Sequence, residues 1–278
     1  MPFRVIEGTF HVLGYSPDGD SVRFEPNDPS LLSLLDGPPA NLNARGHVQL
    51  RFEAIDTLET HFRNEHQPLT LATRALDFTL LQLGITGVEW DVLRTRVTVA
   101  NDGTPGYILS RAVEPNRRPV SFVYAGSPPV ADGSPLFLDT ARLKSSVNFK
   151  LVTEGLAYPT YYKGLFSDLR AAFTAAVTQA RADGLEIWGE DKTNTGFAVP
   201  NLQAITDDVV MLPKLFRRLA EFLDGGGTVG GFEQFLANRQ EGVTVISSTH
   251  FTHFDTLVTV QGDIVKLTEL PENLMFEG

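Results

Sequence analysis

Residues 48–60 read VQLRFEAIDTLET, and this stretch decides the fold. Apolar and polar residues alternate from Val48 to Phe52, which is typical of a β-strand that buries one of its two faces. The alternation gives way to a polar run that contains Asp56 and Glu59. We therefore expect two carboxylates at the end of a buried strand, where side chains leave the wall of the sheet and face solvent.

An earlier stretch also joins acidic residues to an alternating run. Residues 18–24 read DGDSVRF, an acidic turn followed by Val22 and Phe24. Two such strand ends brought together can hold a divalent cation, and an arginine beside it can hold a phosphate. Strict alternation would place Arg51 and Asp56 on opposite faces of a strand. A shared site therefore requires a bend in the chain near residues 54–56.

The flanking patterns predict an α+β fold. They indicate a hairpin over residues 3–26, a loop over 27–46, strands over 47–55, 86–100 and 119–125, and a long loop over 101–118. Helical spacing appears over residues 68–83, 147–156 and 165–184. Five strands, with one helix after the third and two after the fifth, predict a small barrel of the oligonucleotide-binding type, closed or nearly closed.

The remaining residues predict a separate extension. We expect one domain over residues 1–190 and a mixed α/β extension over 191–278, joined by a polar linker at 189–200. Its patterns indicate helices near 212–223 and 232–236 and strands at 243–246 and 256–260. Lys214, Arg217 and Arg218 lie on the first of these helices, which we expect to pack in a core.

Charge and composition limit the classes of function. The chain has 278 residues, a net charge of −11 and no cysteine, which excludes disulfides and thiolate metal sites. Residues 191–278 hold 6 basic and 12 acidic residues and are the more acidic part for their length. Arginine outnumbers lysine by 17 to 6, so a nucleic acid would be held locally at a cleft rather than across a basic face.

Neither a signal peptide nor a membrane span is visible in the sequence. The N-terminal residues lack the apolar core of a signal peptide, and no run of about 18 apolar residues occurs. We therefore expect a cytoplasmic protein without a membrane partner.

Five motifs in order resemble the thermonuclease, or staphylococcal nuclease-like, family over residues 3–190. The chain departs from the family pattern at Leu58, where proline is usual, and at Asn116-Arg117-Arg118, where the second arginine usually stands in a Tyr-Gly-Arg context. The motifs are DGDS at 18–21, RFEAIDTLE at 51–59, Arg118 before PVSFVY, the VN and LVTEGLA segments at 147–157, and LEIW at 185–188.

The resemblance implies a Ca²⁺-dependent nuclease that hydrolyses phosphodiester bonds of DNA or RNA. Substrates would be single-stranded or flexible, and the products would carry 3′-phosphate ends. By this resemblance Asp20 and Asp56 supply carboxylate ligands and Thr57 a backbone carbonyl, with Mg²⁺ or Mn²⁺ as alternatives to Ca²⁺.

The resemblance also assigns the residues that contact substrate. Arg51 and Arg118 would bind the non-bridging phosphate oxygens, and Glu59 would act as the general base. Arg117 is a substrate-binding residue that competes with Arg118 for the second arginine position. Tyr161 would stack on a base or bind a phosphate, and ordinary packing under the last long helix is its alternative.

The sequence also fits two other functions. The chain fits a catalytically inactive binding or scaffold module on the same barrel. It also fits a phosphodiesterase for a small nucleotide, because the negative charge and the scarcity of lysine suit a small substrate. His250 and His253 stand three residues apart, a spacing that on a strand places them on opposite faces, and we expect them to be structural or surface residues rather than zinc ligands.

Overall fold

The structure is a computed structural model that describes residues 2–277. It has an α+β fold whose internal contacts divide the chain into two compact units. Unit 1 comprises Met1–Glu53 and Ala75–Leu151, and unit 2 comprises Ala54–Arg74 and Val152–Gly278. Residues 152–190, which the sequence assigns to the first domain, therefore group with the C-terminal segment. Two helices cross the division, namely α1 (Leu69–Gln82) and α3 (Val147–Thr153).

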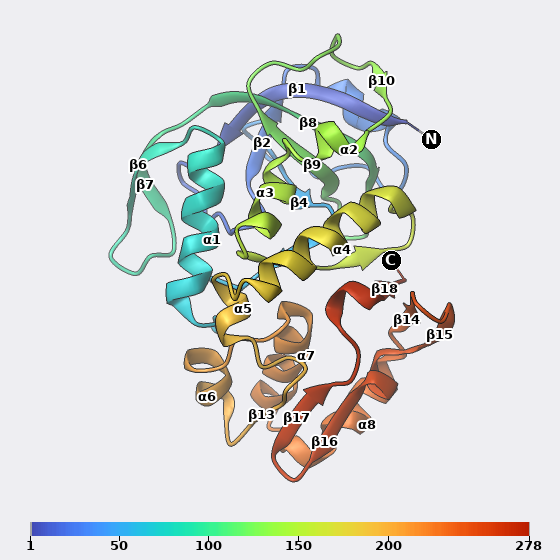
Figure 1. Ribbon diagram of the computed structural model, residues 1–278. Helices are drawn as coiled ribbons and strands as arrows, with labels where there is room; N and C mark the ends of the chain where they lie inside the picture. Colours follow the sequence, from blue (N-terminus) through green and yellow to red (C-terminus); the bar gives the residue numbers. More distant parts are fainter. Residues whose placement is uncertain (1, 278) are drawn as a thin grey trace. The chain divides into compact units, whose positions relative to one another are not determined.

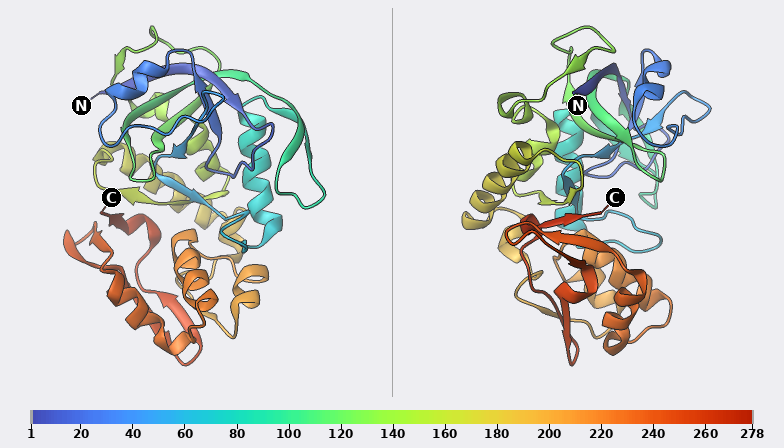
Figure 2. Two further views of the ribbon diagram at one scale, coloured as in Figure 1. Left: turned by 180° about the vertical axis from the view of Figure 1, so that it is seen from behind. Right: turned by 90° about the vertical axis from the view of Figure 1, so that its right-hand side faces the viewer.

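Unit 1 is built on a curled sheet (Figures 1 and 2). The strands follow the order β3-β2-β1-β8-β9-β4, and β10 pairs with β1. The elements of unit 1 are β1 (Phe3–His11), β2 (Arg23–Pro26), η1 (Pro29–Leu34), β3 (Val48–Gln49), β4 (Arg51–Phe52), β6 (Thr86–Trp90), β7 (Val97–Asn101), β8 (Thr104–Val113), β9 (Pro119–Ala125), β10 (Pro135–Leu136) and α2 (Thr140–Leu143).

The sheet is nearly closed into a barrel. Strands β3 and β4 lie at opposite ends of the strand order, yet only Leu50 separates them in the chain. The sheet must curl until its two ends meet, because one residue spans only about 3.3 Å. Phe10, Phe24, Phe52 and Phe122 are fully buried and supply much of the apolar core of this unit.

The predicted loop over residues 101–118 is wrong, because β8 occupies most of it and is the longest of the described strands. Gly103, Pro105, Gly106 and Pro115 suggested a loop. The structure shows a different reason for glycine at position 106. A Cβ on Gly106 would lie 2.4 Å from the carbonyl oxygen of Tyr124 and 2.3 Å from the ring of Phe10. Glycine here permits close packing within a regular strand.

Other predicted elements of this region are confirmed or divided. The strand at residues 119–125 and the helix near 68–83 are confirmed as β9 and α1. The single strand predicted over 86–100 is two antiparallel strands, β6 and β7. The turn between them contains Arg94 at a φ of 53°, a left-handed conformation that the sequence pattern does not signal.

The strand predicted over residues 47–55 is broken into three short pieces. Strands β3 and β4 end at Phe52, and β5 (Ile55–Thr57) begins after a bend. Ala54 lies in this bend with a φ of 71°, and its carbonyl oxygen accepts a hydrogen bond from the Thr160 backbone at 2.9 Å. Alanine rarely adopts this conformation, so the surrounding contacts must hold it there. A bend near residues 54–56, as the sequence analysis requires, is therefore present.

Unit 2 contains the remaining helices and three small sheets. These sheets have the orders β11-β5, β12-β18-β14-β15 and β13-β17-β16. Besides β5, its elements are β11 (Ala157–Pro159), β12 (Tyr161–Tyr162), α4 (Ser167–Ala182), α5 (Ile187–Glu190), β13 (Phe197–Ala198), α6 (Leu202–Asp207), α7 (Pro213–Asp224), η2 (Val229–Gly231), α8 (Phe232–Arg239), β14 (Gly242–Val245), β15 (His250–His253), η3 (Phe254–Leu257), β16 (Val258–Gln261), β17 (Ile264–Leu267), η4 (Pro271–Asn273) and β18 (Leu274–Phe276).

The patterns of the C-terminal third are largely confirmed. Helices α7 and α8 and strands β14 and β16 correspond to the four predicted elements. The short strands β13, β15, β17 and β18 were not predicted, because isolated strands of two to four residues carry little periodicity. None of the described helices combines the length and apolar character needed to cross a lipid bilayer.

Candidate active site

The residues expected at the site fall in both units. In unit 1, Arg51 lies on β4 and Arg118 immediately precedes β9, and these two strands pair in parallel. Arg118 Nε donates a hydrogen bond to Glu114 Oε1 at 2.9 Å. Burial works to raise the pKa of Glu114, but Arg118 and the charge of Arg51 lower it overall. In unit 1, the positive charges of Arg51 and Arg118 therefore both act on one carboxylate.

Arg117 is placed differently from its neighbour. Its φ is 66°, and its Nε donates to the carbonyl oxygen of Pro39 at 2.9 Å. The left-handed backbone turns its side chain toward the 27–46 loop and away from the Glu114 carboxylate that Arg118 contacts. Of the two candidates, Arg118 is thus the one that shares a partner with Arg51.

Asp20 lies at the end of the acidic turn in unit 1. Asp18 and Ser21 bridge across this turn, with Asp18 N donating to the Ser21 carbonyl at 3.0 Å. The backbone oxygen of Asp20 accepts a hydrogen bond from Phe52 N at 3.0 Å. The turn is therefore anchored beside β4, the strand that carries Arg51.

In unit 2, Asp56 and Glu59 converge on one cationic group. The guanidinium of Arg217, on α7, donates to both carboxylate oxygens of Asp56, with Nη1–Oδ1 at 3.0 Å and Nη2–Oδ2 at 2.6 Å. Nη1 also bonds to Glu59 Oε1. The Asp56 and Glu59 side chains are only 7% and 13% exposed, so most of this charge is removed from water.

Asp56 and Glu59 strongly stabilise the charged form of Arg217. Burial works to lower the pKa of Arg217, but the charges of Asp56 and Glu59 raise it well above the ordinary value. Bidentate pairing of guanidinium with carboxylate is among the strongest hydrogen-bonded arrangements available to side chains. Removing either side would leave a poorly hydrated charge behind, which is costly.

Thr57 and Tyr161 are both buried in unit 2. Thr57 pairs with Ala157 between β5 and β11, and only 2% of the residue is exposed. Tyr161 is fully buried, and its hydroxyl hydrogen-bonds Thr174 on α4 at 3.0 Å. Because a ring enclosed by the core cannot stack on a base, the substrate-binding role expected of Tyr161 is replaced by packing under the long helix.

Helix α7 is positioned by a second group of charges, which involves Glu241. Lys214 Nζ lies 3.0 Å from Glu241 Oε1, and Arg218 donates to both oxygens of the same carboxylate at 2.6 Å. Leu215 and Leu219 on the same helix are fully buried, which confirms that α7 packs in a core. The helix is thereby held in a fixed rotation, with Arg217 directed toward Asp56.

Replacing Glu241 with glutamine is expected to destabilise the protein in a pH-dependent way. Burial works to raise the pKa of Glu241, but hydrogen bonds from Arg218 and the charge of Lys214 lower it to about 2. The carboxylate therefore contributes fully above its ordinary pKa of 4.5 and ceases to contribute as pH falls through about 2. Urea unfolding should show a loss on the order of 3 kcal/mol at neutral pH. A wild-type advantage that stays constant down to pH 2 would contradict this.

The donor chemistry of the unit 2 acids suits a hard divalent cation. The carboxylate oxygens of Asp56 and Glu59 are the ligand type that Ca²⁺ and Mg²⁺ prefer. These oxygens are bonded to Arg217, so a metal ion would bind Asp56 and Glu59 in place of the guanidinium. The residues present therefore fit a metal, on condition that Arg217 withdraws.

Sequence reasoning missed the contact made by Arg217. The available signal was three basic residues within five positions, Lys214, Arg217 and Arg218, on an amphipathic helix. Nothing in the sequence identified Asp56, which lies 161 residues away, as the partner.

No protein-family model matches the chain, and no curated protein matches it either.

Proposed function

We propose that this chain is a metal-dependent nuclease that hydrolyses phosphodiester bonds of DNA or RNA, preferring single-stranded or flexible substrates. The observation that supports this proposal most is the convergence of Asp56 and Glu59 on a single cationic group. Two largely buried carboxylates within reach of one cation form the kind of arrangement that a divalent ion uses.

The proposed roles follow from the chemistry of each residue. Asp20 and Asp56 would hold Ca²⁺, or Mg²⁺ or Mn²⁺, through carboxylate oxygens and Thr57 through its carbonyl. Such an ion polarises the phosphoryl oxygen and neutralises charge that builds up on it. Arg51 and Arg118 donate hydrogen bonds to the non-bridging oxygens. Glu59 takes the proton of the attacking water.

The strand order supports a five-stranded barrel of the oligonucleotide-binding type. If β3 and β4 are two halves of one strand, the remaining order is β2-β1-β8-β9 with that strand joining both ends. Its pairing with β9 is parallel, whereas its pairing with β2 is antiparallel. Barrels of this type bind nucleic acids and oligosaccharides on one face.

The ion pair of Arg217 has a consequence for activity. In this arrangement the proposed metal ligand Asp56 and the proposed base Glu59 are both engaged, so the described state is a resting one. The same contact favours a second candidate function, a non-catalytic binding or scaffold module in which Arg217 neutralises the two acids permanently. The two functions differ in whether Arg217 can be displaced by a divalent ion.

Cleavage of labelled substrates tests the proposal. Single-stranded DNA, single-stranded RNA and a dinucleotide would be incubated with the full chain in Ca²⁺ or in a chelator, together with Glu59→Gln. We expect Ca²⁺-dependent cleavage of the polymers that Glu59→Gln loses, because glutamine cannot accept the proton. Cleavage of the dinucleotide alone would redirect the proposal to a small substrate. No cleavage by wild type or by Arg217→Met would favour the non-catalytic module.

A further inference from the structure

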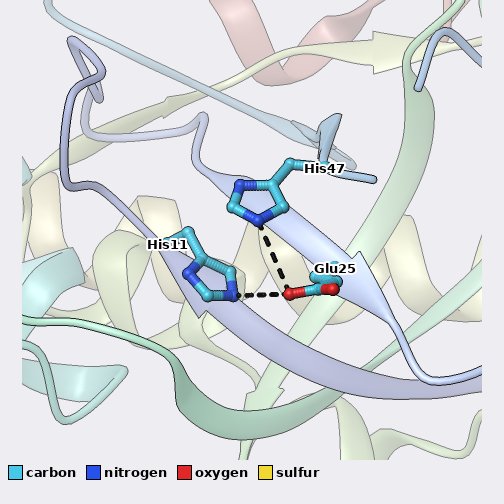
Figure 3. Close-up of side chains that lie close together, drawn as sticks. All are labelled: His11, Glu25 and His47. Atoms are coloured by element: carbon cyan, nitrogen blue, oxygen red, sulfur yellow. Dashed lines mark ion pairs between the residues drawn. The ribbon is translucent and has the colours of Figure 1, made fainter. Parts of the chain in front are cut away.

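A second group of candidate ligands lies in unit 1, on the outer face of the sheet. His11 ends β1, Glu25 lies on β2, and His47 directly precedes β3 (Figure 3). Thr9 pairs with Glu25 across β1 and β2, and His11 stands two residues along from Thr9 on the same face. The register of β2 with β3, continued by one residue, places His47 opposite Glu25. Three neighbouring strands therefore bring the three side chains together.

The spacing of the three ligand atoms matches a metal better than it matches ion pairs. Glu25 Oε2 lies 3.3 Å from His11 Nε2 and 3.5 Å from His47 Nε2. Charge-assisted hydrogen bonds are shorter, about 2.7–2.9 Å. Ligands at about 2.0–2.1 Å from a tetrahedral Zn²⁺ are separated by about 3.3–3.4 Å. One such atom from each of the three side chains lies within 4.8 Å of the other two.

His11 is oriented by a carboxylate behind its ring. Its Nδ1 lies 2.8 Å from Asp102 Oδ2, and the other carboxylate oxygen accepts from the backbone N–H groups of Val12 and Leu13. A charged carboxylate only accepts hydrogen bonds, so Nδ1 carries the proton and Nε2 presents a lone pair. The Thr9 hydroxyl, 2.8 Å from Nε2, donates to that lone pair.

His47 is oriented in a comparable way. Its Nδ1 lies 3.1 Å from the Tyr15 hydroxyl, which also accepts from Asn43 Nδ2 at 2.8 Å. The Asn43 Oδ1 in turn accepts from the His47 backbone N–H at 3.1 Å. The rings of His11 and His47 stack with centroids 4.1 Å apart, and both Nε2 atoms point toward Glu25. Hydrogen bonds of this kind fix the tautomer and ring direction of metal-binding histidines.

The charges around the cluster are balanced. Arg23 and Arg45 lie near the Tyr15 ring, at 5.1 Å and 5.3 Å from its centroid, and oppose a bound cation. The carboxylates of Glu25 and Asp102 offset these two charges.

We propose that His11, Glu25 and His47 bind a divalent transition metal of the Zn²⁺ type. Two imidazoles and one carboxylate suit Zn²⁺ and its neighbours in the first transition row and do not suit Ca²⁺, which prefers oxygen ligands. The Glu25 side chain is 49% exposed, so the site is open to solvent and retains a position for water. A metal here displaces the Thr9 hydroxyl from Nε2 and ties β1, β2 and the start of β3 together. The proposal does not depend on nuclease activity.

Metal binding to the tag-free, chelator-treated full chain tests this proposal. Zn²⁺ would be measured by equilibrium dialysis with elemental analysis, and Co²⁺ by the visible absorption of a low-symmetry, four- or five-coordinate ion. We expect one equivalent of tightly bound Zn²⁺ and a rise in the thermal midpoint. Glu25→Gln and His47→Gln should lose that equivalent, and Asp102→Asn, a positioning residue, should weaken binding by about 10–100-fold.

Two controls separate this site from other sources of metal binding. The double variant His250→Gln/His253→Gln removes the two histidines of β15. It should leave Zn²⁺ binding unchanged. The triple variant Asp56→Asn/Glu59→Gln/Arg217→Met removes these two acids together with their buried cationic partner and should also retain the equivalent of Zn²⁺. Glu25 is half exposed, so Glu25→Gln should fold normally, which circular dichroism would check. Wild type that binds no Zn²⁺, or Glu25→Gln and His47→Gln that bind it as wild type does, would overturn the proposal.

Discussion

Arg51→Ala is expected to lower the turnover of single-stranded DNA by roughly 10²–10³-fold, with a smaller effect on the Michaelis constant. Arg51 lies on β4, which pairs with β9, and Arg118 immediately precedes β9. The positive charges of both arginines lower the pKa of Glu114. In the proposed reaction the Arg51 guanidinium donates to phosphate oxygens whose charge grows in the transition state. The loss should therefore appear mainly in turnover, because the interaction is strongest when that charge is largest.

Two variants define what a change at Arg51 means. Arg51→Lys keeps the charge but loses the bidentate fork, and should recover only part of the activity. Arg96→Ala removes an exposed arginine from the β6–β7 hairpin and should leave the rate unchanged. Initial rates with Ca²⁺ would be compared across the four proteins. Equal rates for wild type and Arg51→Ala would show that any observed cleavage arises at another site.

Arg217→Met is expected to lower the free energy of unfolding by about 3 kcal/mol. That figure is the lower end of the range for removing one partner of a buried ion pair, because 21% of the Arg217 side chain remains exposed. The cost arises from leaving Asp56 and Glu59 close together without a cation. Urea unfolding would measure it. Arg239→Met, which removes a more exposed pair with Glu221, should cost less than about 1 kcal/mol.

Added Ca²⁺ distinguishes a latent metal site from a permanent ion pair. If the acids can accept a divalent ion, Ca²⁺ should restore stability to Arg217→Met and have less effect on wild type, in which the guanidinium competes. A triple variant, Asp56→Asn/Glu59→Gln/Arg217→Met, lacks both charges and should not respond to Ca²⁺. A Ca²⁺ response that is equal in the single and triple variants would place the metal elsewhere.

Local patterns were sufficient for much of the fold. The α+β class, the helices α1, α4 and α7, and the strand β9 follow from hydrophobic periodicity, which acts over neighbouring residues. Strand β8 was not predicted, because glycine commonly marks a turn. At position 106 glycine is present for a different reason, since a Cβ there would collide with the Phe10 ring. The bend at Ala54 was required but not visible, since alanine carries no local preference for a left-handed conformation.

What the amino-acid sequence alone determined about this protein is its alternation of buried and exposed positions, which places Arg51 on a strand and Asp20 in an acidic turn. The expected solvent-facing strand end at Asp56 is wrong, because Asp56 lies inside β5 and is buried. Only the tertiary structure decided which distant groups these residues meet. Arg217 reaches Asp56 across 161 positions, and His11 meets His47 through the register of three strands. Backbone preference is set by nearest neighbours, whereas the partner of a charge is set by the packing of the whole unit.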